Sequence, residues 1–319
     1  MTLNRGCTYR EQVRAGTDGV LVTEYLAEAH AHSTIDTWTA RVAAGEVDVE
    51  SVRATLDTRV RQGNVITWRR PPWDEPDVPL TFDLVFEDEW LVVVAKPGGL
   101  PTMPAGGFLE QTLLTIVRER WAGASPLHRL GRWTSGLVVF ARTTTTASVL
   151  SRAWREGRVH KRYIALGSGE PRWDDREIDV PIGLVPHERI GTVHASSPLG
   201  RPSRSVARVV ERRGASTLFE VDILTGRPHQ VRIHLAAVGH PLVGDPLYAD
   251  GGVPIAHEPG LPGDGGYLLH AARLAFAHPI TGMPTVLDTP PTAAGLRTGA
   301  SIQAGNRRTS CQVGSDPEV

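Results

Sequence analysis

Long apolar runs and cysteines are scarce in this sequence. No apolar stretch reaches the roughly 18 residues that a membrane-spanning helix needs, so the sequence indicates no such helix. The two cysteines, Cys7 and Cys311, are too few for a disulfide framework or a metal site on their own, which favours a reducing compartment. Residues 1–19 carry charges throughout and have no apolar core, so we expect no secretory signal and a cytoplasmic protein.

Lysine is also rare, because only Lys96 and Lys161 interrupt an otherwise arginine-based set of 34 basic residues. The formal net charge of −1 argues against a general nucleic-acid binder. The charges are segregated, however: residues 117–163 hold ten basic residues against two acidic ones, and residues 73–89 hold seven acids and no base. This pattern allows one positive face, although solvated helix faces explain most of these arginines when each is taken singly.

The 319 residues suit two domains, or one large domain with a small appendage. Residues 1–20 are polar and weakly patterned, so we expect a frayed lead-in. Residues 21–70 predict a small unit of two short helices and two strands, and the prolines of residues 71–76 predict a stiff linker. Residues 80–296 mix strands and helices without a βαβ rhythm, which predicts an α+β fold with a mixed, mainly antiparallel sheet and flanking helices. Residues 297–319 have no apolar period and predict a disordered tail.

Two polar loops stand next to apolar strands in the larger region. Lys96 begins Lys-Pro-Gly-Gly-Leu after one strand, where a lysine can serve a phosphate as a point charge or simply lie solvated in a turn. His128 begins His-Arg-Leu-Gly-Arg-Trp-Thr-Ser-Gly, which leads into the strand at residues 136–141. Such loops carry functional sites on rigid scaffolds, but a hairpin loop with structural hydrogen bonds explains this segment as well.

A third segment predicts a helix from His229 to Val238, with Pro228 in its first turn and Gly239 closing it. On this helix Gln230 and His234 share a face, and Arg232 lies away from them. The histidines have no cysteine, aspartate or glutamate at ligand spacing, so we expect no metal here. In Gly244-Asp-Pro-Leu-Tyr, Asp245 can cap a turn, pair with an arginine, or do both.

Together these blocks resemble the RluA-type pseudouridine synthase family, whose sequence pattern is approximately KPxGL, HRLDxxTSGLLL, KxYxALxxG, TGRTHQIRxHL, GDxxY and LxLHAxxLxFxHPxTG. The matching text runs in order from about Leu84 to Gly282. Residues 21–70 resemble the small ribosomal-protein-type RNA-binding module that often precedes this domain.

The resemblance implies isomerisation of uridine to pseudouridine in a ribosomal or transfer RNA, without cofactor or metal. In that family an aspartate starts the reaction, either as a nucleophile at the ribose C1′ or as the base that takes the 2′ proton. The resemblance makes Tyr163 the residue that stacks on the base and Arg232 the partner of the aspartate. It also implies RNA-binding roles on motif, which we assign to Lys96, Arg129, Thr134, Arg227, His229 and Leu268. We expect Arg129, Tyr163 and Arg232 to line one groove with Lys96 at its rim.

Position 131 departs from the family pattern, because Gly131 stands where the aspartate is required. Glycine can supply neither a nucleophile nor a base. Arg232 should then find another partner, since a buried unpaired guanidinium is costly. The nearest acids in motif context are Asp245 and the acids of residues 87–89.

Three hypotheses follow. The first is an active synthase that uses another carboxylate or another mode of attack. The second is a non-catalytic RNA-binding protein that keeps the fold and the groove. The third, an unrelated hydrolase that uses His128 and Ser135, lacks an evident third member of a triad.

Overall fold

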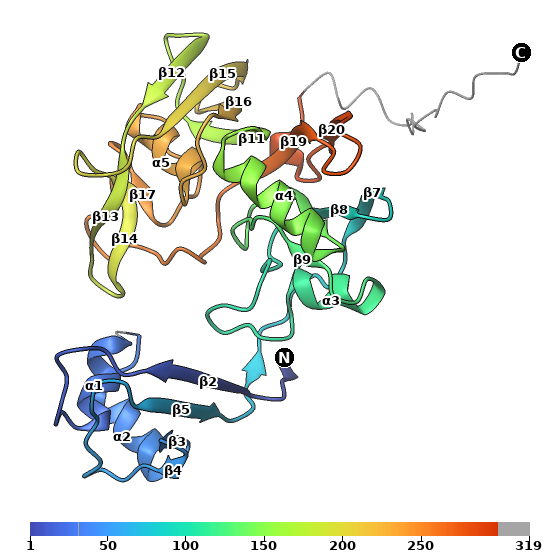
Figure 1. Ribbon diagram of the computed structural model, residues 1–319. Helices are drawn as coiled ribbons and strands as arrows, with labels where there is room; N and C mark the ends of the chain where they lie inside the picture. The colour runs from blue at the N-terminus through green and yellow to red at the C-terminus, as the bar shows by residue number, and fades with distance from the viewer. Residues whose placement is uncertain (31, 299–319) are drawn as a thin grey trace, which may run out of the picture.

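The structure is a computed structural model that describes residues 1–30 and 32–298. The chain forms a small N-terminal unit, blue in Figure 1, and a larger unit built on a ten-stranded sheet. The predicted α+β class and the mixed, mainly antiparallel sheet are confirmed. Most of the tail predicted at residues 297–319 lies outside the described residues. Among the described helices, none is long and apolar enough to cross a membrane.

The N-terminal unit packs two helices on a four-stranded antiparallel sheet. The helices are α1 (Val22–Ala29) and α2 (Ile35–Ala43), and the strand order is β2 (Cys7–Gln12), β5 (Val65–Arg70), β3 (Val47–Val49), β4 (Val52–Arg53). Both predicted helices are present, and the Thr34 side chain caps α2 by accepting a hydrogen bond from the Thr37 N–H. The expected frayed lead-in is wrong, because β2 pairs with β5 along its whole length. β2 is an edge strand with both faces largely exposed, so it lacks the apolar alternation that predicts a strand.

A buried carboxylate joins the two units. Strands β1 (Thr2–Leu3) and β6 (Asp74–Glu75) form a short ribbon within the predicted linker. The fully buried Glu75 side chain accepts hydrogen bonds from the Asn4 amide and from the backbone N–H groups of residues 109–111. Burial alone would raise the pKa of Glu75, but these donors bring its pKa below the usual value. The linker is therefore a fixed joint.

The large sheet extends across the second unit. Its order is β12 (Asp175–Asp179), β15 (Arg204–Arg212), β16 (Ser216–Ile223), β11 (His160–Ser168), β19 (Leu269–Ala277), β10 (Ser135–Ala141), β8 (Leu91–Lys96), β7 (Asp83–Glu87), with β9 (Ser125–Pro126) on β10 and β20 (Pro284–Asp288) on β19. Two hairpins flank it, β13 (Ile182–His187) with β14 (Gly191–Ser196) and β17 (Tyr248–Ala249) with β18 (Val253–Pro254). The helices are α3 (Leu113–Arg120), α4 (Thr144–Arg155) and α5 (Gln230–Ala237), and a short 3-10 turn covers Ala294–Leu296.

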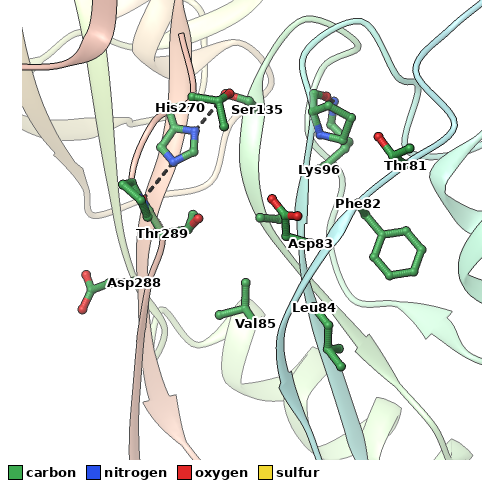
Figure 2. A pocket seen from close by; sticks show the side chains of 14 residues that line it. Thr81, Phe82, Asp83, Leu84, Val85, Lys96, Ser135, His270, Asp288 and Thr289 are labelled. Atoms are coloured by element: carbon green, nitrogen blue, oxygen red, sulfur yellow. Dashed lines mark hydrogen bonds between the residues drawn. The ribbon is translucent and has the colours of Figure 1, made fainter. Parts of the chain in front are cut away.

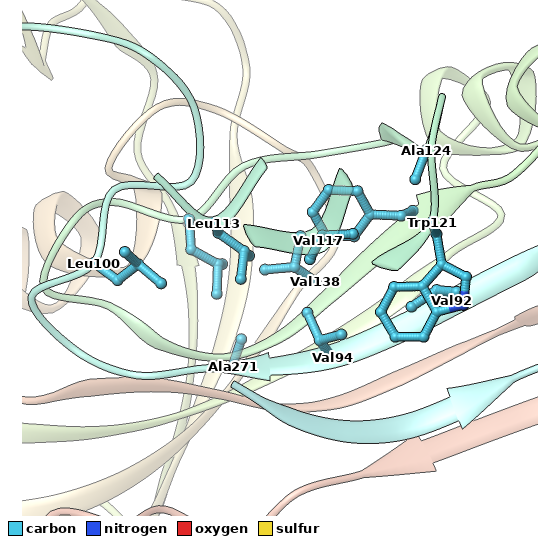
Figure 3. Close-up of a cluster of buried hydrophobic side chains, with 11 residues drawn as sticks. Val92, Val94, Leu100, Leu113, Val117, Trp121, Ala124, Val138 and Ala271 are labelled. Carbon is cyan, nitrogen blue, oxygen red and sulfur yellow. The ribbon is translucent and has the colours of Figure 1, made fainter. Parts of the chain in front are cut away.

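Helices cover both faces of the central strands, so β10 is buried at every residue. On one face Val92, Val94 and Val138 pack against α3 (Figure 3). On the other face Val93 and Val139 pack against α4. Successive side chains of a strand point to opposite faces, so this continuous apolar run supplies both cores.

The parallel contact between β10 and β19 depends on a glycine. A Cβ on Gly136 would lie 2.2 Å from the backbone oxygen of Ala271, and the φ of Gly136 is 110°. Only glycine allows both this conformation and this close approach. The contact brings the loop before β10 next to the start of β19.

Helix α5 lies on the same face as α3. Val231 and Leu235 of α5 pack on Val221 and Leu269, and Tyr163 contacts both this cluster and the α3 cluster. Tyr163 therefore lies between the two helix-covered cores, on the face where the motif residues gather.

Candidate active site

The loop of residues 128–135 is held rigidly before β10. The His128 ring accepts a hydrogen bond from the Val139 N–H and stacks on Trp154 with a centroid distance of 5.1 Å. Burial lowers the pKa of His128 to about 3, and Lys161 adds to this effect, so the ring is neutral at physiological pH. The Thr102 hydroxyl exchanges hydrogen bonds with both backbone groups of Leu130. This loop places Gly131 at the surface.

The buried side chain of Lys96, at the end of β8, supports the same loop. Its ammonium donates to the carbonyl oxygens of Pro97, Leu100 and Arg132 at 2.7 to 3.0 Å, and the side chain is 1% exposed. Burial, with a contribution from Arg132, lowers the pKa of Lys96 to about 7. All three protons are engaged, so the predicted position at the rim of an RNA groove is wrong, and so is the alternative of a solvated lysine.

Arg232 pairs with Asp245, one of the acids that the sequence offered as its partner. Its guanidinium makes two hydrogen bonds of 2.7 Å to the carboxylate of Asp245, and both side chains are almost fully buried. Asp245 also accepts from the backbone N–H groups of Leu247 and Tyr248, so it is both the charge partner and the turn cap. Burial opposes the charge of Arg232, but Asp245 raises its pKa above the usual value.

Two tyrosine rings enclose this ion pair. The guanidinium carbon of Arg232 lies 4.2 Å from the ring centroid of Tyr267 and 4.9 Å from that of Tyr248. The Tyr248 hydroxyl donates to the carbonyl of His194 and lies 2.6 Å from the Nδ1 of His229. Burial, reinforced by Arg232, lowers the pKa of His229 to about 3, so its ring is neutral. Sequence reasoning missed Tyr267.

Tyr267 connects Arg232 to the loop. A Cβ built on Gly131 would lie 3.2 Å from the Tyr267 hydroxyl and 3.5 Å from the Thr134 hydroxyl. Because the ring of Tyr267 contacts Arg232 and its hydroxyl faces Gly131, the structure brings residues 131, 134, 232 and 267 together.

The loops that carry Asp245 and Tyr267 cross at two glycines. A Cβ on Gly244 would lie 2.4 Å from the backbone oxygen of Gly266, and a Cβ on Gly266 would lie 2.4 Å from that of Gly244. Both have positive φ angles, 75° and 119°. Any larger residue at this crossing would separate the two loops.

Tyr163 faces the same side of the sheet. It pairs with Ala271 of β19, while its neighbour Ile164 pairs with His270. Burial raises the pKa of Tyr163 to about 12, so its phenol keeps its proton at physiological pH. The ring is suited to stacking rather than to proton transfer.

Arg129 and Arg227, both predicted to bind RNA, differ in their contacts. Arg129 is exposed, has no hydrogen-bond or ion-pair partner in the described part of the chain, and acts electrostatically on His229. Arg227 instead donates to the carbonyl of Pro202 and contributes its backbone N–H to Gln230. The side chain thus ties the segment before α5 to Pro202, and its contacts give no support to a role in RNA binding.

The prediction for Leu268 is wrong by one position. Leu268 packs with Leu166, Leu218 and Leu296, a cluster that contains neither Tyr163 nor Tyr267. Letter by letter, the pattern LxLHA places its two leucines on Tyr267 and Leu269, and both of these lie in the α5 cluster with Tyr163. Because side chains alternate along a strand, a shift of one residue exchanges the faces.

None of the acids suggested as a substitute carboxylate is available to react at Gly131, because each is either fully hydrogen-bonded or lies far from the loop. Asp245 is saturated by four donors. Glu87 accepts from Trp121 and Asp88 from His278, at the turn before Leu91. The 128–135 loop meets the other end of β8, about 17 Å away at 3.3 Å per residue.

The hydrolase hypothesis is also excluded by geometry. His128 faces Trp154, whereas the Ser135 hydroxyl lies 2.8 Å from Nδ1 of His270, whose Nε2 lies 2.9 Å from the Thr289 carbonyl oxygen. This Ser–His pair is buried and borders a cavity of about 730 Å³ between β7 and the residues after β20 (Figure 2). His270 points to the face opposite Tyr163, so the cavity is separate from the motif residues.

The positive stretch of residues 117–163 is not one continuous face. Arg120 and Arg142 lie near Glu87, Arg158 pairs with Glu156, and Arg162 pairs with Asp222. In the described part of the chain, the basic side chains of this stretch without a hydrogen-bond or ion-pair partner are those of Arg129, Arg152, Arg155 and Lys161.

Comparisons with known proteins agree with these observations. The family model described as RNA pseudouridylate synthase matches residues 90–237. An uncharacterised RNA pseudouridine synthase of Synechocystis is 38% identical over 269 residues, which cover 84% of this chain and 92% of that protein. The ribosomal large subunit pseudouridine synthase D of Nitrosomonas europaea is 33% identical over 265 residues, covering 76% and 73%. The solved human RNA pseudouridylate synthase domain containing 1 superposes with a TM-score of 0.55 at 26% identity, covering 68% of this chain and 86% of that one.

The first of these relatives is similar over nearly its whole length. The chain belongs to the RluA-type RNA pseudouridine synthase family.

Proposed function

We propose that this synthase isomerises a uridine in a structured segment of ribosomal or transfer RNA, and that its reaction centre is the surface around Gly131. The observation that carries this assignment is the meeting of Tyr267, Arg232 and Thr134 at an exposed glycine, on the sheet face that also holds Tyr163. Ribosomal RNA is the first substrate to test, because one relative is named for the large ribosomal subunit.

The roles of the flanking residues follow from their contacts. A base must leave its stack before its glycosidic bond can be reached, which costs a few kcal/mol and costs least in a loop or bulge. Tyr163, neutral and positioned between two packed cores, offers a ring on which the uracil stacks. Arg129, exposed and unpaired among the described residues, is placed to hold a phosphate next to the extruded nucleotide.

The N-terminal unit supplies a second RNA surface in this proposal. Arg41 lies 4.3 Å from the ring centroid of Trp68, which is half-buried, and 4.5 Å from that of Trp38, which is buried in the core below. Arg70 lies 3.4 Å from the ring centroid of Trp73. Arginines interleaved with aromatic rings suit single-stranded RNA, whose bases stack and whose phosphates need cations.

The same alternation continues into the larger unit. The indole N–H of Trp73 donates to the carbonyl of Gly107, and the guanidinium of Arg132 lies 4.5 Å from the ring of Phe108 and 5.3 Å from that of Trp133. Trp133 is 37% exposed. The row therefore leads from the N-terminal unit to the loop that contains Gly131. We place this activity in the cytoplasm, in keeping with the low cysteine content.

The test is release of tritium from RNA labelled at C5 of uridine, because C5 gives up its hydrogen when it becomes the glycosidic carbon. Wild-type protein should release tritium from ribosomal or transfer RNA. The modified positions should then disappear from a chemical map of RNA taken from cells that lack the gene.

Binding is measured in parallel as a function of salt. The affinity should fall steeply as salt rises, since arginine–phosphate contacts release counterions. Arg129→Ala should weaken binding about tenfold and flatten the salt dependence by about one phosphate contact, with the melting temperature unchanged. Arg158→Ala is the matched control, because Arg158 is already paired with Glu156. Salt-dependent binding without any tritium release would favour the non-catalytic RNA-binding alternative that Gly131 suggests.

A further inference from the structure

We propose that the Tyr267 hydroxyl replaces the missing carboxylate and is the catalytic nucleophile toward the ribose; this inference rests on the function proposed above. Two of the departures from the family pattern face one another, since glycine at 131 replaces an aspartate and tyrosine at 267 stands on a leucine of the pattern. One change removes an oxygen-bearing side chain from the site, and the other brings an oxygen to the same place.

The geometry makes the replacement direct. The Tyr267 oxygen lies 3.2 Å from the position of a Cβ at residue 131. An aspartate carries its carboxylate one carbon beyond Cβ, so its oxygens would extend into the space next to this hydroxyl. The phenol oxygen thus lies where the pattern would place the reacting group.

The hydroxyl is also uncommitted. Within the described residues it has no hydrogen-bond partner, although Tyr267 as a whole is only 4% exposed. Tyr248, the other ring on Arg232, uses its hydroxyl on His194 and His229. Tyr163 contributes a ring to the stacking role.

Arg232 supports the ring of Tyr267. Its guanidinium lies 4.2 Å from the Tyr267 ring centroid and is fixed there by Asp245. This cation–π contact holds the Tyr267 ring in place, with its hydroxyl directed at Gly131. The Thr134 hydroxyl is the other oxygen near Gly131, but an aliphatic alcohol ionises far less readily than a phenol, whose ordinary pKa is near 10.

The reaction balances without a cofactor. The phenol first loses its proton to water, and the phenolate oxygen bonds to C1′ as the C1′–N1 bond breaks, its electron pair leaving with N1 of uracil. The uracil turns, C5 attacks C1′, and the C1′–oxygen bond breaks to return the phenolate. C5 then releases its proton to solvent, and N1 takes one up. Tyrosine is an established nucleophile at an anomeric carbon in some glycosidases.

The experiment compares tritium release and RNA binding for wild type, Tyr267→Phe and Asp264→Asn. Tyr267→Phe should lower kcat at least 100-fold, while the Kd for RNA changes less than threefold and the melting temperature is kept, because the lost hydroxyl bonds to no described residue. Asp264 is the matched control: its carboxylate lies in the same loop, accepts from the Leu261 N–H and acts on Arg132, and its variant should keep wild-type activity.

A rescue variant gives an independent readout. Gly131→Asp in the Tyr267→Phe background should restore at least a tenth of the activity. Its rate should be level from pH 6 to 9, because a carboxylate is already ionised there. Residue 131 has no positive φ, so a side chain is not strained by the backbone there.

The outcomes separate the two proposals. An active wild type whose Tyr267→Phe variant is equally active, or whose activity is lost only in Asp264→Asn, would overturn the role of Tyr267 and leave the proposed function standing. A wild type that binds RNA and releases no tritium from any RNA would overturn both.

Discussion

At the scale of single residues, the chemical type of a side chain was readable from the sequence, but its surroundings were not. Lys96 is the clearest instance, because a lysine after a strand and before two glycines suggests an exposed cation. Its three acceptors come from residues 97, 100 and 132, and the last of these is distant in the chain. The partner of Arg232, in contrast, could be anticipated, since a buried guanidinium requires an acid and Asp245 follows in the same block.

The buried ammonium yields a stability prediction. Lys96→Met should lower the free energy of unfolding by about 2–4 kcal/mol, because three buried carbonyl oxygens lose their donor. Urea unfolding measures this. The other lysine is the control: Lys161 is half-buried and has no hydrogen-bond partner among the described residues, so Lys161→Met should not destabilise the fold. Equal losses in the two variants would contradict the structural role of Lys96.

At the scale of elements, the sequence predicted the helices and strands whose apolar residues and end signals all lie within their own segment. β10 is seven residues buried on both faces, and α2 has its cap and apolar face in adjacent positions. β2 and β12 escaped prediction because they are edge strands with largely exposed side chains. Their pairing with distant strands, rather than their own composition, makes them strands.

The prediction for Leu268 was wrong because the sequence pattern was aligned one residue out of register, and this shift changed which residue was assigned to the site. Assigning the leucine of LxLHA to Leu268 rather than to Leu269 and Tyr267 chose the wrong hydrophobic cluster at the start of β19. A pattern match fixes which strand carries a residue, but the pleat decides which side the residue serves.

The crossing of the two loops gives a test at this scale. Gly266→Ala should destabilise the fold by about 2–3 kcal/mol and reduce tritium release more than RNA binding, because the new methyl group would push the Tyr267 loop away from Gly244. Gly263→Ala, in the same loop, is the control, since its Cβ would meet nothing within 4 Å. A fully active and stable Gly266→Ala protein would show that the crossing does not position Tyr267.

At the scale of the whole molecule, burial lowers the pKa of four interior histidines, His270 and three others in which the shift is large. Burial lowers the pKa of His128 and of His229 to about 3 and that of His234 to about 4. In the unfolded chain each would titrate near pH 6.5, so between pH 6.5 and these values the unfolded state binds more protons than the folded state. Their contribution is therefore fully present above pH 6.5 and is lost as the pH falls.

The corresponding prediction is acid lability that begins below pH 6.5. Each of the three histidines with a large shift should cost on the order of 2 kcal/mol at pH 5 relative to pH 7. Urea unfolding at a series of pH values measures the slope, and His234→Asn should make that slope shallower because one of the contributing rings is removed. A stability that is constant from pH 7 to pH 5 would show that these rings take up protons while folded.

The Glu75 joint has a consequence for how the whole molecule meets a long substrate. Two tethered binding units normally lose rotational freedom when one ligand spans both, and that loss weakens the complex. Here a single carboxylate, buried and held by donors from both sides of the joint, has already removed that freedom during folding. Under the function proposed above, we therefore expect the protein to prefer an RNA in which the segment that contacts the N-terminal unit and the target nucleotide are separated by the distance that the joint fixes.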